Sequence, residues 1–333
     1  MRLYLDLART VLANGVWTSK PGGVDSINYF GYTCMIALDG GFPLLTTRAI
    51  NFKAVTAELL WQLSGDPHVN NLRRHTRIWD KWAGQDGHLE SAPGRFWRRF
   101  PYPAFSEKAG GEMWSQTGTD HVHTSKRWLE FDQLAWVVSN LRQRANSRKH
   151  VIVAWHPGNA TVSNVPPCIV ALIWNVKGQR LNLHVTQRSA DIAVGLPFDI
   201  AELALLTLIL ARETSLQPGM MMYSITDAHV YCGRHSSRSS PRTTAKLHEA
   251  LRVFLQRDRS SEQEVADLGA NELGGDPGDE YNHIPGLLRQ LSREPRQLPV
   301  VRISARPMER LEPGDIVLEG YHPHPRIPFS VVP

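Results

Sequence analysis

PPC at residues 166–168, QRSAD at 187–191, GLPFD at 195–199 and DAHVY at 227–231 lie in one continuous stretch of the chain. Together they contain a thiol, a guanidinium group, several carboxyl groups and an imidazole, the side chains most used in nucleophilic and acid–base chemistry. The residues between them are mostly apolar and are typical of buried strands and helices. The stretch therefore predicts a buried framework that carries reactive side chains.

The spacing of apolar residues predicts an α/β chain. We expect helices at residues 2–14, 52–63, 128–145, 198–214 and 244–256. We expect strands at residues 26–38, 150–155, 169–176, 180–187 and 220–231. The middle three of these strands follow one another closely, so we expect them to share one sheet. The helix at 198–214 is apolar on almost all of one side and is expected to be central.

The composition is that of a folded globular protein, with 333 residues, 42 % hydrophobic and 21 % charged. The longest apolar run, residues 204–211, is far shorter than the ~20 residues that span a bilayer, so we expect no membrane partner. Lys and Arg exceed Asp and Glu by 37 − 32 = 5 residues, which favours an anionic partner. Three cysteines without a CxxC spacing argue against disulfides and against a metal site. With no signal-like N-terminal segment, a cytoplasmic location is expected.

Residues 232–281 differ from the rest because they are rich in Ser, Arg, Asp, Glu and Gly. We expect them to form a surface insertion within a single domain that comprises residues 1–333.

Each reactive residue also has a purely structural explanation. An isolated Cys168 is most often an inert buried thiol. Arg188 and Asp191 can form a surface ion pair, and His229 can be a hydrogen-bonded core residue.

Taken together, however, the segments resemble the thymidylate synthase family over nearly the whole chain, apart from residues 232–281 and a looser region at 84–126. Matching segments elsewhere are DGGFPLLTTR (39–48), ELLWQLSGD (58–66), IWDKWA (78–83), LSREPRQLP (291–299) and EGYHPHP (319–325). The resemblance implies an α/β (α+β) fold, in which helices pack on a mixed β-sheet. It also implies a sheet-to-sheet homodimer, a small-molecule nucleotide substrate and 5,10-methylenetetrahydrofolate as cofactor.

The resemblance implies three roles in the chemistry. Cys168 matches the nucleophile that adds to C6 of a pyrimidine monophosphate, so that C5 can attack a one-carbon unit. Arg188 fits the cation that lowers the pKa of this thiol. Glu58 matches the general acid–base residue of the family.

Nucleotide-binding residues are implied in the same way. The full set is Arg148, Lys149, Gln187, Ser189, Asp199, His229 and Tyr231. Arg188 and Ser189 match the phosphate site. The pair at 148–149 matches two cations that reach the same phosphate from the other subunit of a homodimer. His229 and Tyr231 match the residues that hold the sugar 3′-hydroxyl group.

Folate-binding residues complete the implied site. Trp79 and Trp82 match aromatic groups near the folate, and Asp191 matches a residue between folate and nucleotide. The last residues, RIPFSVVP at 326–333, match an apolar C-terminus that closes over the bound cofactor.

One position departs from the family motif, which reads G-L-P-F-N, because the last residue here is Asp199. An Asn amide donates to O4 of uracil and accepts from N3–H, whereas cytosine presents the reverse pattern. A protonated carboxyl group can accept from the 4-amino group and donate to N3, and an ionised one can stabilise a protonated N3. Asp199 therefore favours a cytosine base, unless it merely caps the start of the helix.

The same change marks the hydroxymethylases of the family, in which water instead of a hydride attacks the one-carbon unit. We expect a catalytic set of Cys168, Glu58, Asp199 and Arg188 that converts CMP, or next dCMP, to the 5-hydroxymethyl product. We expect this reaction to serve antibiotic biosynthesis. The nearest alternative is methylation of dUMP. A DNA cytosine-modifying or nucleic-acid-binding protein is a weaker one, because no Gly-rich loop for S-adenosylmethionine is visible.

Three further positions depart from the family pattern. Pro21 replaces an Arg of the phosphate loop, Pro93 replaces a Tyr associated with proton removal from C5, and Ile169 replaces the His after the nucleophile. These changes argue against dUMP methylation and favour altered phosphate and sugar subsites.

Overall fold

The computed structural model describes residues 1–102, 122–124, 129–161, 163–235, 241–256, 264 and 279–332. The α-helices are α1 (Arg2–Asn14), α2 (Phe52–Ser64), α3 (Pro93–Arg98), α5 (Gln133–Gln143), α6 (Pro157–Ala160), α7 (Gly195–Glu213), α8 (Pro241–Leu255) and α10 (Ile284–Leu291). Short 3-10 helices are η1 (Leu72–Arg74), η4 (Met308–Arg310) and η5 (Pro313–Asp315). The strands are β1 (Val16–Thr18), β2 (Val24–Ala37), β3 (Phe100–Tyr102), β4 (Val122–Thr124), β5 (Leu129–Phe131), β6 (Val151–Val153), β7 (Ile169–Lys177), β8 (Arg180–Asp191), β9 (Gln217–Arg234), β10 (Val300–Ile303) and β11 (Ile316–Glu319).

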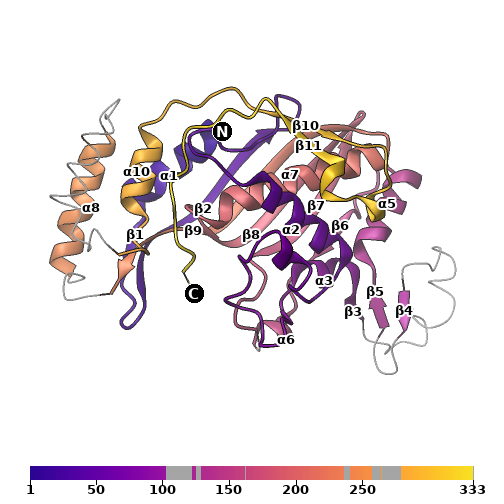
Figure 1. Ribbon diagram of the computed structural model, residues 1–333, viewed down its shortest axis with the longest axis horizontal. Helices are drawn as coiled ribbons and strands as arrows, with labels where there is room; N and C mark the ends of the chain where they lie inside the picture. Colours follow the sequence, from indigo (N-terminus) through magenta and orange to yellow (C-terminus); the bar gives the residue numbers. More distant parts are fainter. Residues whose placement is uncertain are drawn as a thin grey trace.

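The main sheet has six strands in the order β1-β2-β9-β8-β7-β6. Neighbouring strands are antiparallel except β8 and β9, which are parallel, so the sheet is mixed. The strands β6, β7 and β8 are neighbours, which confirms the prediction that three successive strands share a sheet. Smaller sheets pair β10 with β11 and order β3-β5-β4. Figure 1 shows β3, β4 and β5 at one end of the molecule and α8 at the other.

Helices α1 and α7 pack against the main sheet, and α2 packs against α7 (Figure 1). The sequence of α7 is apolar almost throughout, and the side chains from Leu203 to Leu206 are at most 1 % exposed. Such complete burial is expected of a helix enclosed on all sides. The prediction of a central helix is therefore confirmed, and α2 and the sheet enclose the residues that α7 presents.

Two predicted boundaries were wrong. Residues 129–131 form β5 and not the start of a helix, because Asp132 caps α5 by accepting a hydrogen bond from the backbone N–H of Ala135 at 2.9 Å. The central helix begins at Gly195 and not at Phe198, with Pro197 in its first turn. Proline is tolerated there because the first N–H groups of a helix have no partner within it.

The described part of residues 232–281 contacts the rest of the fold. On α8, Leu247, Leu251 and Phe254 are buried, and α8 packs against α1. The ends of the segment meet, because the backbone N–H of His283 donates to the carbonyl of Tyr231 at 2.9 Å. The segment thus leaves the end of β9 and returns to it; its assignment as a surface insertion in a single domain stays a prediction.

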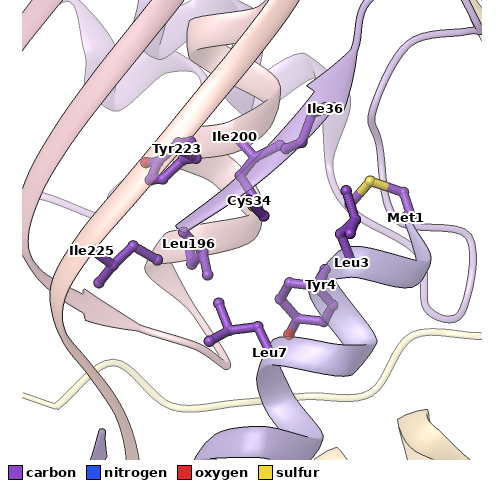
Figure 2. Close-up of a pocket in the computed structure, with 10 residues that line it drawn as sticks. All are labelled: Met1, Leu3, Tyr4, Leu7, Cys34, Ile36, Leu196, Ile200, Tyr223 and Ile225. Carbon is purple, nitrogen blue, oxygen red and sulfur yellow. The ribbon is translucent and has the colours of Figure 1, made fainter. Parts of the chain in front are cut away.

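An apolar pocket lies between α1, β2, α7 and β9 (Figure 2). Its lining includes Tyr4, Cys34, Leu196, Ile200 and Tyr223. The ring of Tyr223 forms one wall of this pocket. The same side chain also extends to the polar residues beside α7 that are described below. Among the helices that the structure describes, none is long and apolar enough to cross a membrane.

Candidate active site

The predicted nucleophile, Cys168, lies directly before β7 and beside Arg188 of β8. The Sγ atom is 3.8 Å from Nη2 of Arg188, and the backbone N–H of Arg188 donates to the carbonyl of Cys168 at 2.8 Å. The guanidinium group also donates to the carbonyls of Pro166 and Pro167, at 2.8 and 3.2 Å, and lies over the ring of Trp155. These contacts fix a cation next to the thiol.

The net effect on Cys168 differs from the expectation. Burial raises the pKa of the thiol by more than Arg188 lowers it, and Asp199 raises it further. The expected lowering by Arg188 is present, but the pKa of Cys168 remains above its ordinary value. The thiol is therefore protonated at rest, and Arg188 limits the free energy needed to ionise it.

Asp199 does not cap α7, because the helix begins at Gly195 and Asp199 lies in its second turn. Its Oδ2 atom accepts a hydrogen bond from Nε2 of Gln187 at 2.8 Å. Gln187 is itself held by the carbonyl of Ser189 and by the hydroxyl of Tyr223, which donates to its Oε1 atom. Burial raises the pKa of Asp199 to about 7, although Gln187 lowers it. A half-buried carboxyl group with a fixed orientation thus exchanges a proton near neutrality.

Glu58 of α2 is 5 % exposed and accepts a hydrogen bond from one of the predicted folate residues. The indole Nε1 of Trp79 donates to its Oε1 atom at 2.7 Å, and the rings of Trp79 and Trp82 lie 5.6 Å apart, edge to face. Burial raises the pKa of Glu58 to about 8, the hydrogen bond from Trp79 lowers it, and Asp199 raises it. Glu58 is therefore suited to both giving and taking a proton at neutral pH.

Asp191 ends β8 and organises the turn before α7. Its Oδ1 atom accepts hydrogen bonds from the backbone N–H groups of Ala193 and Val194, at 2.8 and 3.2 Å, and lies 3.8 Å from Nδ1 of His283. No ion pair joins Asp191 to Arg188 in the described part of the chain, so that structural explanation for the two residues is wrong.

The C-terminal segment lies against this side of the site. His283, 1 % exposed, contacts the carbonyl of Ser330 through Nε2 at 3.0 Å. The guanidinium carbon of Arg48 lies 4.7 Å from the ring centre of Phe329. The analysis of the sequence did not identify His283, because its contacts with Asp191 and Ser330 span long distances along the chain.

The predicted sugar-binding residues lie together near the end of β9. The rings of His229 and Tyr231 are 5.0 Å apart, and His229 is 9 % exposed. Within the described residues its Nδ1 atom has no hydrogen-bond partner, and it is 3.7 Å from a carboxyl oxygen of Asp227. Burial raises the pKa of Tyr231 to about 12, so its hydroxyl stays protonated. The pair offers hydrogen-bond donors and acceptors of the kind that bind a hydroxyl group.

The predicted phosphate residues are only partly brought together. Ser189 and Arg188 are neighbours on β8, whereas Arg148 and Lys149 are exposed between α5 and β6. No contact connects this exposed pair with Arg188 or Ser189 in the part of the single chain that the structure describes. A role for the pair in the site of another copy stays a prediction.

The three departures occupy ordinary structural positions. Pro21 lies in an exposed turn before β2, and Ile169 is the first residue of β7. Pro93 is the first residue of α3, where its fixed backbone angle favours the start of a helix. None of the three side chains can titrate.

A further carboxyl group, Glu202 of α7, was missed by the analysis of the sequence. It is 3 % exposed, and Glu58 and Asp199 both raise its pKa. Its position three residues after Asp199 in an apolar helix was a signal, because helical spacing places the two on neighbouring parts of one face. Glu58, Asp199 and Glu202 thus form a carboxyl cluster, a name used below for these three residues.

The site can hold a flat ring with polar edges. Trp79 and Trp82 offer aromatic surfaces, and the Oε2 atom of Glu58 is buried without a hydrogen-bond partner among the described residues. An unpaired buried oxygen next to aromatic rings is suited to a ring that carries N–H donors. The described residues contain no group of three or more His, Cys, Asp or Glu side chains suited to a metal ion.

Comparisons with known proteins agree with this geometry. Residues 2–333 match the family model described as thymidylate synthase. The chain is also similar to the thymidylate synthase of Haloferax volcanii, with 41 % identity over 340 aligned positions that cover 98 % of this chain and 95 % of the relative. The match to the family model includes every site residue described above.

Proposed function

This chain belongs to the thymidylate synthase family, and we propose that it hydroxymethylates C5 of a cytosine nucleoside 5′-monophosphate, CMP in preference to dCMP. The family uses 5,10-methylenetetrahydrofolate as its one-carbon donor, so the chain is an enzyme that transfers a one-carbon unit to a nucleotide. The observation that carries the choice of base is Asp199, a carboxyl group held in place by Gln187 and protonated near neutrality.

Cytosine needs a group that can transfer a proton. When the sulfur of Cys168 bonds to C6, the electron pairs of the ring shift so that negative charge develops on N3. A protonated Asp199 can donate its proton to N3 and keep a hydrogen bond from the 4-amino group, whereas an amide cannot give up a proton at this position. The side chain thus supports adduct formation on cytosine in a way that the Asn of the family motif does not.

The remaining residues have complementary roles in this proposal. Arg188 stabilises the thiolate of Cys168, and Arg188 with Ser189 binds the phosphate. His229 and Tyr231 bind the sugar. Trp79, Trp82 and Asp191 hold 5,10-methylenetetrahydrofolate, which supplies the one-carbon unit when bound. Glu58 exchanges protons beside that unit.

We also propose a homodimer formed through the open face of the main sheet. Val16, Phe30 and Met35 of β1 and β2 are apolar and 70, 84 and 48 % exposed, which is unusual for large side chains on a sheet. In such a dimer Arg148 and Lys149 would bind the phosphate in the partner's site.

The second candidate is methylation of dUMP. The comparisons support it more directly than the first, because the relative with 41 % identity is named thymidylate synthase. A protonated carboxyl group also offers uracil one donor for O4 and one acceptor for N3–H. Asp199 therefore permits uracil, although cytosine alone requires its proton.

Product analysis distinguishes the two candidates. The protein is incubated with 5,10-methylenetetrahydrofolate and with CMP, dCMP or dUMP, and product masses are measured. We expect a hydroxymethyl product from CMP with release of tetrahydrofolate. A methyl product from dUMP with formation of dihydrofolate would overturn the proposal in favour of the second candidate.

The variant Asp199→Asn tests the residue itself. Two mismatched hydrogen bonds, each costing about 1–3 kcal/mol when a buried group is left unpaired, lower kcat/KM for the cytosine nucleotide by ~30-fold or more. Activity on dUMP is expected to rise relative to activity on CMP. Glu249→Gln, on the exposed side of α8, is the control that leaves both activities unchanged. An unchanged preference in Asp199→Asn would contradict the assignment.

A further inference from the structure

The carboxyl cluster contains one residue that the proposed function does not use. Glu202 lies one helical turn beyond Asp199 on α7, and α2, which carries Glu58, packs against α7. The Oε1 atom of Glu202 and the Oε2 atom of Glu58 are both buried without a hydrogen-bond partner within the described residues. Two unsatisfied carboxyl oxygens on a pair of packed helices require an explanation, because each costs free energy.

The surroundings of Glu202 favour its neutral form. The titratable groups that face it are Glu58 from α2, Asp199 from its own helix and the hydroxyl of Tyr223 from β9. Burial contributes most to the raised pKa of Glu202, followed by the charges of Glu58 and Asp199. Like charges this close do not ionise together, so neighbouring carboxyl groups share protons.

A water molecule accounts for both unsatisfied oxygens. A buried water needs two to four polar partners, and a carboxylic acid, a carboxylate and a water can satisfy one another. We propose that Glu202 and Glu58 share one proton through a bound water, and that Glu202 is a positioning residue that holds this water for Glu58. The inference rests on the proposed function for its role in the reaction, but the shared proton does not depend on which nucleotide is the substrate.

The shared proton suits the hydration step of hydroxymethylation. The oxygen of the water bonds to the exocyclic methylene carbon on C5, one O–H bond breaks, and the proton passes to the carboxylate of Glu58. The exocyclic π electrons form the C5=C6 bond, and the C6–S bond breaks to release the thiolate of Cys168, which recovers a proton from the pair. Glu202 keeps the water in place and the pair singly protonated.

Proton release on unfolding tests the shared proton without substrate or cofactor. At about pH 7 a protonated buried Glu ionises when the chain unfolds. Because either carboxyl group alone can keep the single proton at pH 7, we expect Glu202→Gln and Glu249→Gln to release the same number of protons per chain as the unsubstituted protein, and the double variant with Glu58→Gln and Glu202→Gln to release about one proton fewer. Release lower by about one proton in Glu202→Gln alone would mean that each carboxyl group carries its own proton, and equal release from the double variant and the unsubstituted protein would mean that the pair carries none; either result would overturn the proposal. If Glu202→Gln does not fold, infrared titration of protonated carboxyl groups in the unsubstituted protein replaces it, and absence of any such group at pH 7 would overturn the proposal.

Turnover tests the positioning role, with whichever nucleotide the unsubstituted protein uses. We expect Glu202→Gln to lower kcat by ~10- to 100-fold and to change KM for the nucleotide by less than about threefold. The decline of the rate at alkaline pH, caused by loss of the shared proton, should move to lower pH in this variant, because Glu58 alone then holds the proton. A kcat within about twofold and an unchanged pH profile would refute the positioning role. A methyl product from dUMP would refute the proposed function separately, because proton release does not depend on the product.

Discussion

Replacement of Asp199 by Asn should change how the stability of the protein depends on pH. Burial raises the pKa of Asp199 from 3.8 to about 7. When the pKa of an acid is higher in the folded state than in the unfolded state, the folded chain binds more protons than the unfolded chain at pH values between the two pKa values. The free energy of unfolding therefore falls as the pH rises from about 4 to about 7, and is constant outside this range.

The size of the effect follows from the same shift. One proton contributes about 1.4 kcal/mol per pH unit, so a shift of about three units corresponds to at most ~4 kcal/mol. Asp199 is half-buried, and water screens part of this charge, so about 2–3 kcal/mol is the expected total. The variant Asp199→Asn lacks this contribution and should gain stability relative to the unsubstituted protein as the pH rises.

Equilibrium urea unfolding at about pH 5, 6, 7 and 8, at one protein concentration, measures this difference. The two proteins are compared at each pH, so contributions of Glu58 and Glu202 that are common to both largely cancel. Glu249→Gln should follow the unsubstituted protein at every pH. If the difference between Asp199→Asn and the unsubstituted protein stays constant from pH 5 to 8, Asp199 does not hold a proton near neutrality, and the argument for cytosine loses its basis.

Two further predictions concern the neighbours of this carboxyl group and the second subunit. Trp79→Phe removes the 2.7 Å hydrogen bond to Glu58 and should raise the pKa of Glu58 from about 8 by roughly one unit. The part of the pH profile of kcat that reports the titration of Glu58 should then shift to higher pH. An unshifted profile would argue against Glu58 as the titrating group. The variants Cys168→Ala and Arg148→Ala should each be inactive. A mixture of the two should recover up to about a quarter of the activity, because each hybrid dimer contains one intact site. If native mass spectrometry shows hybrid dimers but no activity is recovered, a phosphate site shared between subunits is excluded.

Local periodicity was sufficient to predict much of the framework. The predicted helices at residues 2–14 and 52–63 correspond to α1 and α2, and the strands at 169–176 and 180–187 correspond to β7 and β8. In these elements the apolar residues recur on the side that faces the core, so the sequence pattern matches the burial seen in the structure. The start of α5 was misplaced because a single cap, Asp132, decides it. The start of α7 was misplaced because Gly195 and Pro197 disfavour a helix interior, although both are compatible with a first turn.

The site residues could be identified from the sequence by type, but their protonation could not. A cation beside a thiol predicts a lowered pKa for Cys168, whereas in the folded chain burial outweighs Arg188. The sign of such a balance depends on how much water each group loses, and this is a property of tertiary packing. For the same reason the sequence could not decide whether Asp199 caps a helix or reads a base. The start of α7 at Gly195 excludes the cap.

In the proposed reaction, Glu202 adapts the site to consume water. Glu58 and Glu202 are far apart in the sequence and meet only because α2 packs on α7. Burial favours the neutral form of the Cys168 thiol and of the members of the carboxyl cluster, so the site at rest stores protons, one of which Glu58 and Glu202 share in the proposal above. A reaction in which a hydride is transferred gains little from a third buried acid, whereas addition of water requires that a proton be accepted and returned at the same place. A stored, shared proton next to Glu58 is therefore the feature that most favours hydration of the one-carbon unit in this chain.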